Sequence, residues 1–191
     1  MKKLLNPIEF FDDKKLLIFN LIVFAIGTVV AILMKATFSS PIDLHFATKI
    51  IPLETFFGNL VSVTALFVTF FLSGKIINKK TRFIDCLNLA FYVRIPYYVL
   101  TLSNFSYYFS NQLIKIEEEN DLNVLVENTL TEMIIGYVFI FCFFAFLLML
   151  GITIYRGFTI ITNAKKTSDY LILVGIFLTI TILSSFLFRN I

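Results

Sequence analysis

The chain has 191 residues, of which 58% are hydrophobic and only 15% are charged, and its formal net charge is +3. Charged residues make up about a quarter of a typical soluble domain, so this composition excludes an ordinary water-soluble fold and indicates an integral membrane protein. Metalloprotease, serine-hydrolase and phosphate-binding loop motifs do not occur in the sequence. We therefore predict no enzymatic activity, no catalytic residue, no cofactor and no metal.

Five apolar stretches are long enough to cross a hydrocarbon core of about 30 Å, which takes roughly 20 helical residues. Because their apolar runs lack polar alternation, they favour helices over a closed barrel of strands. The predicted fold class is all-α, an integral membrane bundle forming a single domain over residues 1–191. The first stretch is longer than a signal-peptide core, so we expect it to be retained. We predict membrane-spanning helices over residues 16–34, 55–77, 86–108, 133–155 and 170–188.

The segments that join these stretches alternate in charge. The N-terminal segment and the connections after stretches two and four hold eleven of the sixteen Lys and Arg residues, against five acidic residues, a net charge of +6. The other connections and the C-terminal end hold four basic and eight acidic residues, a net charge of −4. Because Lys and Arg accumulate in cytoplasmic loops, this pattern predicts a cytoplasmic N-terminus and an outer C-terminus. Tyrosines near the ends of the stretches agree, since their rings favour the headgroup level.

The two outer connections offer little sign of chemistry. The first, residues 35–54, holds the only histidine, His45, which we do not expect to bind a metal because a single histidine without further ligands is a poor metal site. Its apolar residues predict that this connection touches the bilayer surface. The second, about residues 110–132, is acidic, and we interpret its carboxylates as a solvated charged face rather than a cation site.

The third stretch is irregular, because Arg94 lies directly before Ile95 and Pro96. An ionisable residue inside a membrane is costly to bury and is a functional candidate, and a proline predicts a kink or break at the preceding residue. Two structures are compatible with this pattern. Either residues 82–93 form a helix on the cytoplasmic surface and the span begins near Pro96, or the span begins near Asp85 and Arg94 extends toward the inner headgroups. Both favour a lipid-phosphate or structural role for Arg94 over a transport role.

The two cytoplasmic connections are short and basic, and each holds a Lys-Lys-Thr triplet, at residues 79–81 and 165–167. They predict attraction to anionic lipid headgroups, worth about 1 kcal/mol for each nearby Lys or Arg. Thr81 is placed to cap the helix that follows it. The candidate lipid or partner contacts are Arg94, Pro96, Lys79, Lys80, Arg82, Arg156, Lys165 and Lys166.

Small and mildly polar residues within the stretches predict contacts between helices. Gly27 and Ala31 form a small-xxx-small pair on the first helix, which indicates a face where another helix packs closely. Amide and hydroxyl side chains inside a membrane more often tie helices together than bind a substrate. Those in the stretches are Asn20, Asn59, Ser62, Thr64, Asn104, Thr179, Thr181 and Ser184.

Residues 72–96 read LSGKIINKKTRFIDCLNLAFYVRIP, in which a glycine ends one span, a basic stretch follows and an aromatic-rich helix runs into Ile-Pro. Residues 149–166 read MLGITIYRGFTIITNAKK and run into a loop that ends near Ala164, while Asn6-Pro7 and the pair Phe10-Phe11 open the chain. Together these segments resemble the Yip (Ypt/Rab-interacting) domain family of five-span membrane proteins, in its bacterial branch. The resemblance implies a multi-pass protein of the bacterial inner membrane without enzymatic activity. The GTPase-binding region of the eukaryotic members has no counterpart in the roughly 15 residues before the first stretch.

Two function classes follow from the sequence. The first is a non-enzymatic membrane protein that organises lipids or partner membrane proteins, with anionic headgroups on its cytoplasmic face and a membrane-protein partner or second copy as further candidates. The second is a small-solute or ion permease with a site near the break in the third stretch. We expect no nucleic-acid partner. A water-accessible cavity facing Arg94 would favour the permease.

Overall fold

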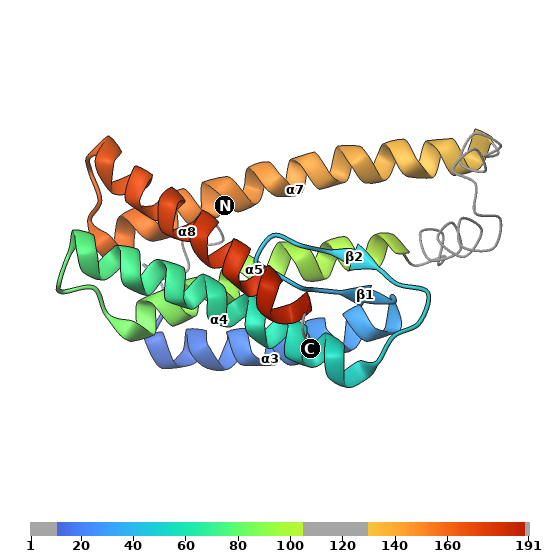
Figure 1. Ribbon diagram of the computed structural model, residues 1–191, viewed down its shortest axis with the longest axis horizontal. Helices are drawn as coiled ribbons and strands as arrows, with labels where there is room; N and C mark the ends of the chain where they lie inside the picture. The colour runs from blue at the N-terminus through green and yellow to red at the C-terminus, as the bar shows by residue number, and fades with distance from the viewer. Residues whose placement is uncertain (1–10, 105–129, 190–191) are drawn as a thin grey trace.

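The computed structural model describes residues 11–104 and 130–189. These residues form the helices α3 (Asp13–Leu33), α4 (Pro52–Ile77), α5 (Phe83–Thr101), α7 (Leu130–Thr162) and α8 (Thr167–Arg189), shown in Figure 1. Two short strands, β1 (Ala36–Thr37) and β2 (His45–Phe46), pair antiparallel between α3 and α4, and a 3-10 turn η1 (Leu102–Asn104) follows α5. All five helices are long and apolar enough to cross a membrane. The predicted all-α class with five such helices is confirmed.

The helix ends follow local chemistry. Pro52 begins α4, where the first N–H groups of a helix have no partner within it, so the missing N–H of proline costs no hydrogen bond. Lys35 follows α3 with φ of 52°, and Asn163 follows α7 with φ of 54°, so both helices end in a left-handed residue. Because α7 continues to Thr162, the prediction that Arg156 lies in a loop is wrong: its side chain is exposed on the last turns of α7. At 33 residues, α7 is about 50 Å long and exceeds a 30 Å hydrocarbon core, so a charged side chain near its end need not enter the lipid.

The helix α5 passes through Pro96 without interruption. The prediction of a surface helix that ends before Pro96 is therefore wrong. The prediction that the Arg94 side chain extends toward the inner headgroups is also wrong, because this side chain is 0% exposed inside the bundle. Thr81 does not cap α5 either. Its hydroxyl donates to the carbonyl oxygens of Gly74 (3.0 Å) and Asn78 (2.8 Å), so it closes the C-terminal end of α4 instead.

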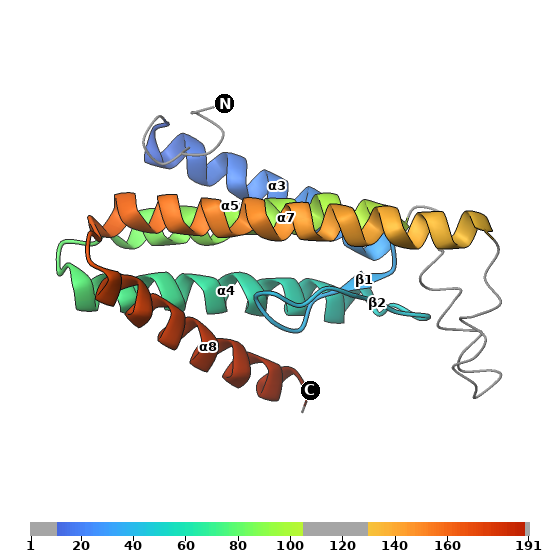
Figure 2. The same cartoon turned by 90° about the horizontal axis from the view of Figure 1, so that it is seen from above.

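The bundle has a packed centre and two outer helices. The helix α5 packs against α3, α4 and α7, while α8 lies mainly on α4. Figures 1 and 2 show α7 and α8 meeting at their short connection and diverging toward the opposite end. Both carry large exposed apolar side chains, such as Phe141 of α7 at 76% and Leu171 of α8 at 67%. Such surfaces suit contact with lipid, whereas they would promote aggregation in water.

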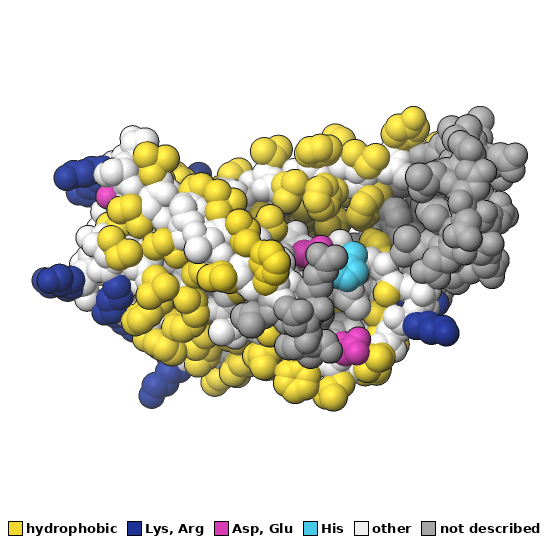
Figure 3. All heavy atoms as spheres, viewed as in Figure 1, with side chains coloured by type: hydrophobic (Ala, Val, Ile, Leu, Met, Phe, Trp, Pro, Cys, Tyr) yellow, Lys and Arg dark blue, Asp and Glu magenta, His cyan; other side chains and the backbone are white. Residues whose placement is uncertain are grey.

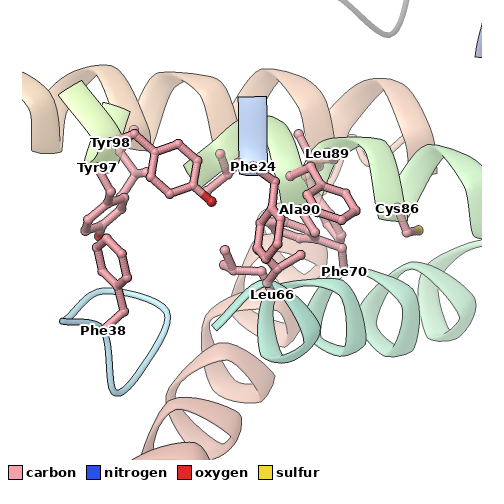
Figure 4. Close-up of a cluster of buried hydrophobic side chains, with 14 of the residues drawn as sticks. Phe24, Phe38, Leu66, Phe70, Cys86, Leu89, Ala90, Tyr97 and Tyr98 are labelled. Carbon is pink, nitrogen blue, oxygen red and sulfur yellow. The ribbon is translucent and has the colours of Figure 1, made fainter. Parts of the chain in front are cut away.

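The buried core joins α3, α4 and α5, as Figure 4 shows for Phe24, Leu66, Phe70 and Leu89. The close-packed face predicted on the first helix is confirmed, because Ala31 is fully buried and a Cβ atom added at Gly27 would overlap the Tyr98 ring of α5. Without hydrophobic attraction between helices inside lipid, association depends on such close packing and on interhelical hydrogen bonds.

Basic side chains gather at one end of the bundle, and hydrophobic side chains cover its middle (Figure 3). This basic end comprises the start of α3, the α4–α5 connection and the α7–α8 connection. There Arg82 pairs with Asp13, so the starts of α3 and α5 are joined. The Asp13 carboxylate, and to a smaller extent the Asp85 carboxylate, holds the pKa of Arg82 above its ordinary value. The Tyr155 and Tyr170 rings stack 4.9 Å apart near the same end.

Candidate functional site

The connection between α3 and α4 folds into the bundle instead of lying on the bilayer surface. Phe38 is 0% exposed, and Ala36, Ser40 and Pro41 are buried with it. The Ser62 hydroxyl of α4 donates to the Ser40 carbonyl oxygen at 3.0 Å. We call residues 35–47 the inserted hairpin. Non-helical backbone at membrane depth is tolerated only where protein buries it or water solvates it. Here protein buries Ala36, Phe38, Ser40 and Pro41, whereas Ile42 and His45 are exposed.

Arg94 holds the inserted hairpin in place. Its Nη1 donates to the Pro41 carbonyl oxygen at 3.0 Å, and its Nη2 lies 3.4 Å from Oδ1 of Asn59. The guanidinium carbon lies 4.4 Å from the centre of the Phe38 ring and 4.6 Å from that of Tyr97, so the cation sits between two aromatic faces. Among the described residues, no carboxylate forms an ion pair with Arg94, and its Nε has no hydrogen-bond partner. Arg94 is thus a buried cation solvated by a carbonyl, an amide and two rings.

The hairpin and Arg94 meet near the middle of the bundle. Arg94 lies eleven residues after the start of α5 at Phe83, which is about 16 Å along the helix. Ser62 lies ten residues after the start of α4 at Pro52, about 15 Å from the opposite end. Both distances are close to half of a 30 Å hydrocarbon core. In a membrane spanned by α4 and α5, peptide groups this far from the helix ends need polar partners, because unpaired polar groups in hydrocarbon are costly.

Asn59 joins three helices at this centre. Its Nδ2 donates to the Thr28 hydroxyl of α3 at 2.7 Å, and the Tyr98 hydroxyl of α5 lies 3.0 Å from Nδ2 and 3.1 Å from Oδ1. Elsewhere, Asn20 donates to Asn88 at 3.1 Å, and Asn104 donates to the Met34 carbonyl at 2.7 Å. The predicted role of these amides in tying helices together is confirmed, whereas Thr64 and Thr179 bond within their own helices.

Replacing Asn59 with alanine is expected to destabilise the protein by about 1–3 kcal/mol. The substitution removes bonds to two other helices and leaves Thr28 and Tyr98 short of partners in a dry interior. The measurement is the free energy of unfolding in mixed micelles. Thr64→Val is the matched control, because Thr64 is exposed on the same helix and bonds only to the Leu60 carbonyl. Equal losses in the two variants would contradict the role of Asn59.

The hairpin also carries an aspartate–histidine pair that sequence reasoning missed. Nδ1 of His45 lies 3.3 Å from Oδ2 of Asp43, and their side chains are 49% and 39% exposed. The hydrogen bond from His45 holds the pKa of Asp43 below its ordinary value of 3.8, although burial opposes that shift. The signal was their spacing, because residues two apart on an extended strand point to the same face. The described residues contain no group of three or more His, Cys, Asp or Glu placed to hold a metal ion.

The pair predicts a dependence of stability on acid. Because folding lowers the pKa of Asp43, its carboxylate stabilises the hairpin at pH values above 3.8, and this contribution is lost as the pH falls through the folded pKa. We expect wild type to melt at a higher temperature than Asp43→Asn at pH 7, with the difference disappearing once the pH is below the lowered pKa of Asp43. Glu54→Gln, at the start of α4, is the control. A difference that persists in acid would contradict the assignment.

An apolar cavity of about 410 Å³ lies between α4, α7 and α8. Phe70 of α4 forms its floor, and the walls come from Gly151 and Ile154 of α7 and from Leu173 and Phe177 of α8. We call this space the α7–α8 groove. Its lining residues do not include Arg94, which bonds to the hairpin instead. The groove lies where the two outer helices begin to diverge.

A second, polar cavity of about 340 Å³ lies at the basic end. Lys165 and Lys166 line it, whereas Lys79, Lys80 and Arg82 lie exposed nearby and do not. The structure therefore separates the predicted contact residues. Arg94 and Pro96 are buried in the bundle centre, the lysines gather at the basic end, and Arg156 lies exposed on α7.

Comparisons of this chain with protein-family models, with curated proteins and with solved structures give no match.

Proposed function

We propose that this chain is a non-enzymatic, multi-pass membrane protein that binds membrane lipid in the α7–α8 groove and so organises lipid around itself. The observation that carries the proposal is the apolar cavity of about 410 Å³ between α4, α7 and α8. Its volume falls in the range of small-molecule sites, roughly 300–1,000 Å³. Apart from Tyr155 and Tyr170, whose hydroxyl bonds to Thr159, the lining is apolar, so it offers little to orient a polar solute and suits a hydrocarbon chain.

The arrangement of the outer helices supports access from the bilayer. The helices α7 and α8 diverge from their connection (Figures 1 and 2), and two of the side chains that line the groove between them are exposed. Val174 beside the groove is 51% exposed and Tyr155 is 56% exposed. A lipid could therefore enter from the membrane without crossing the packed centre of α3, α4 and α5.

We further propose a cytoplasmic N-terminus, an outer C-terminus and residence in a bacterial inner membrane, as in the Yip-like proteins that the sequence resembles. The charge asymmetry between alternate connections supports this orientation. It can be tested by cysteine labelling in intact cells. A cysteine at Glu118 should react with an impermeant reagent, and one at Lys79 should react only after the membrane is opened. The reverse pattern would overturn the orientation.

Lipid binding can be tested by purifying the protein in a mild detergent, exchanging the detergent extensively and quantifying retained lipid by native mass spectrometry. We expect at least one phospholipid to remain bound per chain. A chain that retains none would overturn the proposal. A stoichiometric membrane-protein partner or a second copy, without lipid, would instead support the role of organising proteins.

A second function, a small-solute or ion permease, is favoured by one observation. The inserted hairpin carries the Asp43–His45 pair shortly after Pro41, whose carbonyl oxygen accepts a hydrogen bond from Arg94. Intramembrane ionisable groups often mark ion or proton pathways. Reconstituted protein should then pass protons or small ions across sealed liposomes, and Asp43→Asn should reduce the flux. Liposomes as tight as protein-free ones would exclude this function.

A further inference from the structure

The polar cavity at the basic end has the chemistry of an anion site. Lys165 and Lys166 line it together with the polar side chains of Asn78, Thr162 and Asn163. The acidic residue on its wall, Asp169, is already engaged, because its Oδ2 accepts from the backbone N–H groups of Lys165 and Lys166, both at 3.1 Å. Among the described residues, neither lysine ammonium forms an ion pair. Two cationic side chains are thus available to a ligand.

The polar cavity and the α7–α8 groove lie along the same faces of the same three helices. On α4, Ile77 lines the first and Phe70 the second, seven residues or about 10 Å apart. On α7, Thr162 and Ile154 are eight residues apart, and on α8, Asp169 and Leu173 are four apart. Residues four, seven or eight apart lie on the same side of a helix, so the two cavities lie one above the other.

Their depths match the layers of a bilayer. The headgroup region on each side adds only about 5–8 Å to the hydrocarbon core. The polar cavity lies at the helix ends, and the groove lies about 6–12 Å further along the helices. A ligand that fills both must carry an anionic group and, about 6–12 Å away, an apolar chain.

We propose that the two cavities form one site for an anionic phospholipid, with its phosphate at Lys165 and Lys166 and one acyl chain in the α7–α8 groove. This assignment rests on the proposed lipid-binding function and names the class of lipid. Charge complementarity selects the occupant, because a zwitterionic lipid has no net charge for the two lysines to attract. A soluble anion would leave the apolar groove unfilled.

The headgroup half is tested with the two Lys-Lys-Thr triplets. The double variant Lys165→Gln/Lys166→Gln removes the lysines that line the cavity, and Lys79→Gln/Lys80→Gln removes the same charge from the same end outside it. The probe is a phosphatidylglycerol titrated into delipidated protein, with occupancy read by native mass spectrometry. We expect the first variant to bind roughly 10- to 30-fold more weakly than wild type. The second should change affinity less than threefold.

The acyl half is tested with two glycines. A Cβ atom added at Gly151 or at Gly175 meets nothing within 4 Å, so both positions accept a larger side chain, but only Gly151 lines the groove. Gly151→Phe should fill the groove and reduce phosphatidylglycerol occupancy on the order of tenfold, whereas Gly175→Phe should leave it unchanged. Thermal melting of each variant verifies that it is folded.

The outcomes separate this inference from the proposed function. If wild type binds neither phosphatidylglycerol nor phosphatidylcholine, lipid binding itself is wrong. If it binds both equally, or if the two lysine pairs have equal effects, lipid binding stands and the anionic site is wrong. Competition by inorganic phosphate without an effect of Gly151→Phe would show a soluble anion site and would also overturn the inference.

Discussion

Replacing Arg94 with alanine is expected to release the inserted hairpin from the bundle. The substitution leaves the buried Pro41 carbonyl without its donor, at about 1–3 kcal/mol. It also removes the cation from between the Phe38 and Tyr97 rings, contacts worth up to about 2 kcal/mol each when desolvated. Relief from burying a charge offsets part of this loss. We expect a net loss of about 2–4 kcal/mol in the free energy that keeps the hairpin closed.

Hydrogen exchange of the hairpin amides measures this effect directly. The Ala47 N–H, which donates to the Lys35 carbonyl at 2.9 Å, should exchange roughly 30- to 1,000-fold faster in Arg94→Ala. The exchange rate in Arg94→Lys should lie between those of wild type and Arg94→Ala. An ammonium can donate to the Pro41 carbonyl, but it lacks the planar group that packs between two rings. Amides in the middle of α4 should be less affected. Unchanged exchange in the hairpin would show that Arg94 does not hold it.

Replacing Gly27 with alanine is expected to destabilise the whole bundle. The added methyl group would overlap the Tyr98 ring, which is 6% exposed and is hydrogen-bonded to Asn59, so the ring cannot move without breaking those bonds. Overpacking costs about 1–3 kcal/mol or more and outweighs a gain of up to about 1 kcal/mol in helix propensity. The melting temperature should fall by several degrees.

Other glycines provide the comparison. Gly175→Ala, where the new methyl group meets nothing, should be neutral or slightly stabilising. Gly157→Ala should cost less than Gly27→Ala, because the atom in its way is a terminal methyl group of Leu89, which can rotate. From highest to lowest, the expected order of melting temperatures is Gly175→Ala, then Gly157→Ala, then Gly27→Ala. A different order would show that α3 and α5 do not pack through Gly27.

Several features could be predicted from local patterns alone. The five helices follow from apolar length, because a segment such as Leu16–Met34 must satisfy its backbone internally wherever it meets lipid. The close-packed face at Gly27 and Ala31 follows from helical spacing and small side chains. The ends were less well predicted, since nothing in the composition of residues 156–162 stops α7 after Tyr155.

The centre could not be predicted in this way, because its contacts join residues far apart in the chain. Arg94 and Pro41 are 53 residues apart, and Asn59 and Thr28 are 31 apart. Pro96 suggested a broken helix, yet neighbouring helices hold α5 continuous, as is common inside membranes. The connection between α3 and α4 has the apolar residues of a segment that lies on the bilayer surface. It folds into the bundle because Ser62 and Arg94 form hydrogen bonds with its backbone carbonyl groups there.

The sequence by itself determined that this protein belongs in a membrane and which stretches form its helices, because hydrophobicity acts on each segment independently of the others. Only the tertiary structure decided where the Arg94 side chain points. A buried cation must find its partners wherever the fold supplies them, and here the fold supplies a carbonyl from an inserted hairpin and the faces of two aromatic rings. The groove between α4, α7 and α8 likewise arises from how three helices meet.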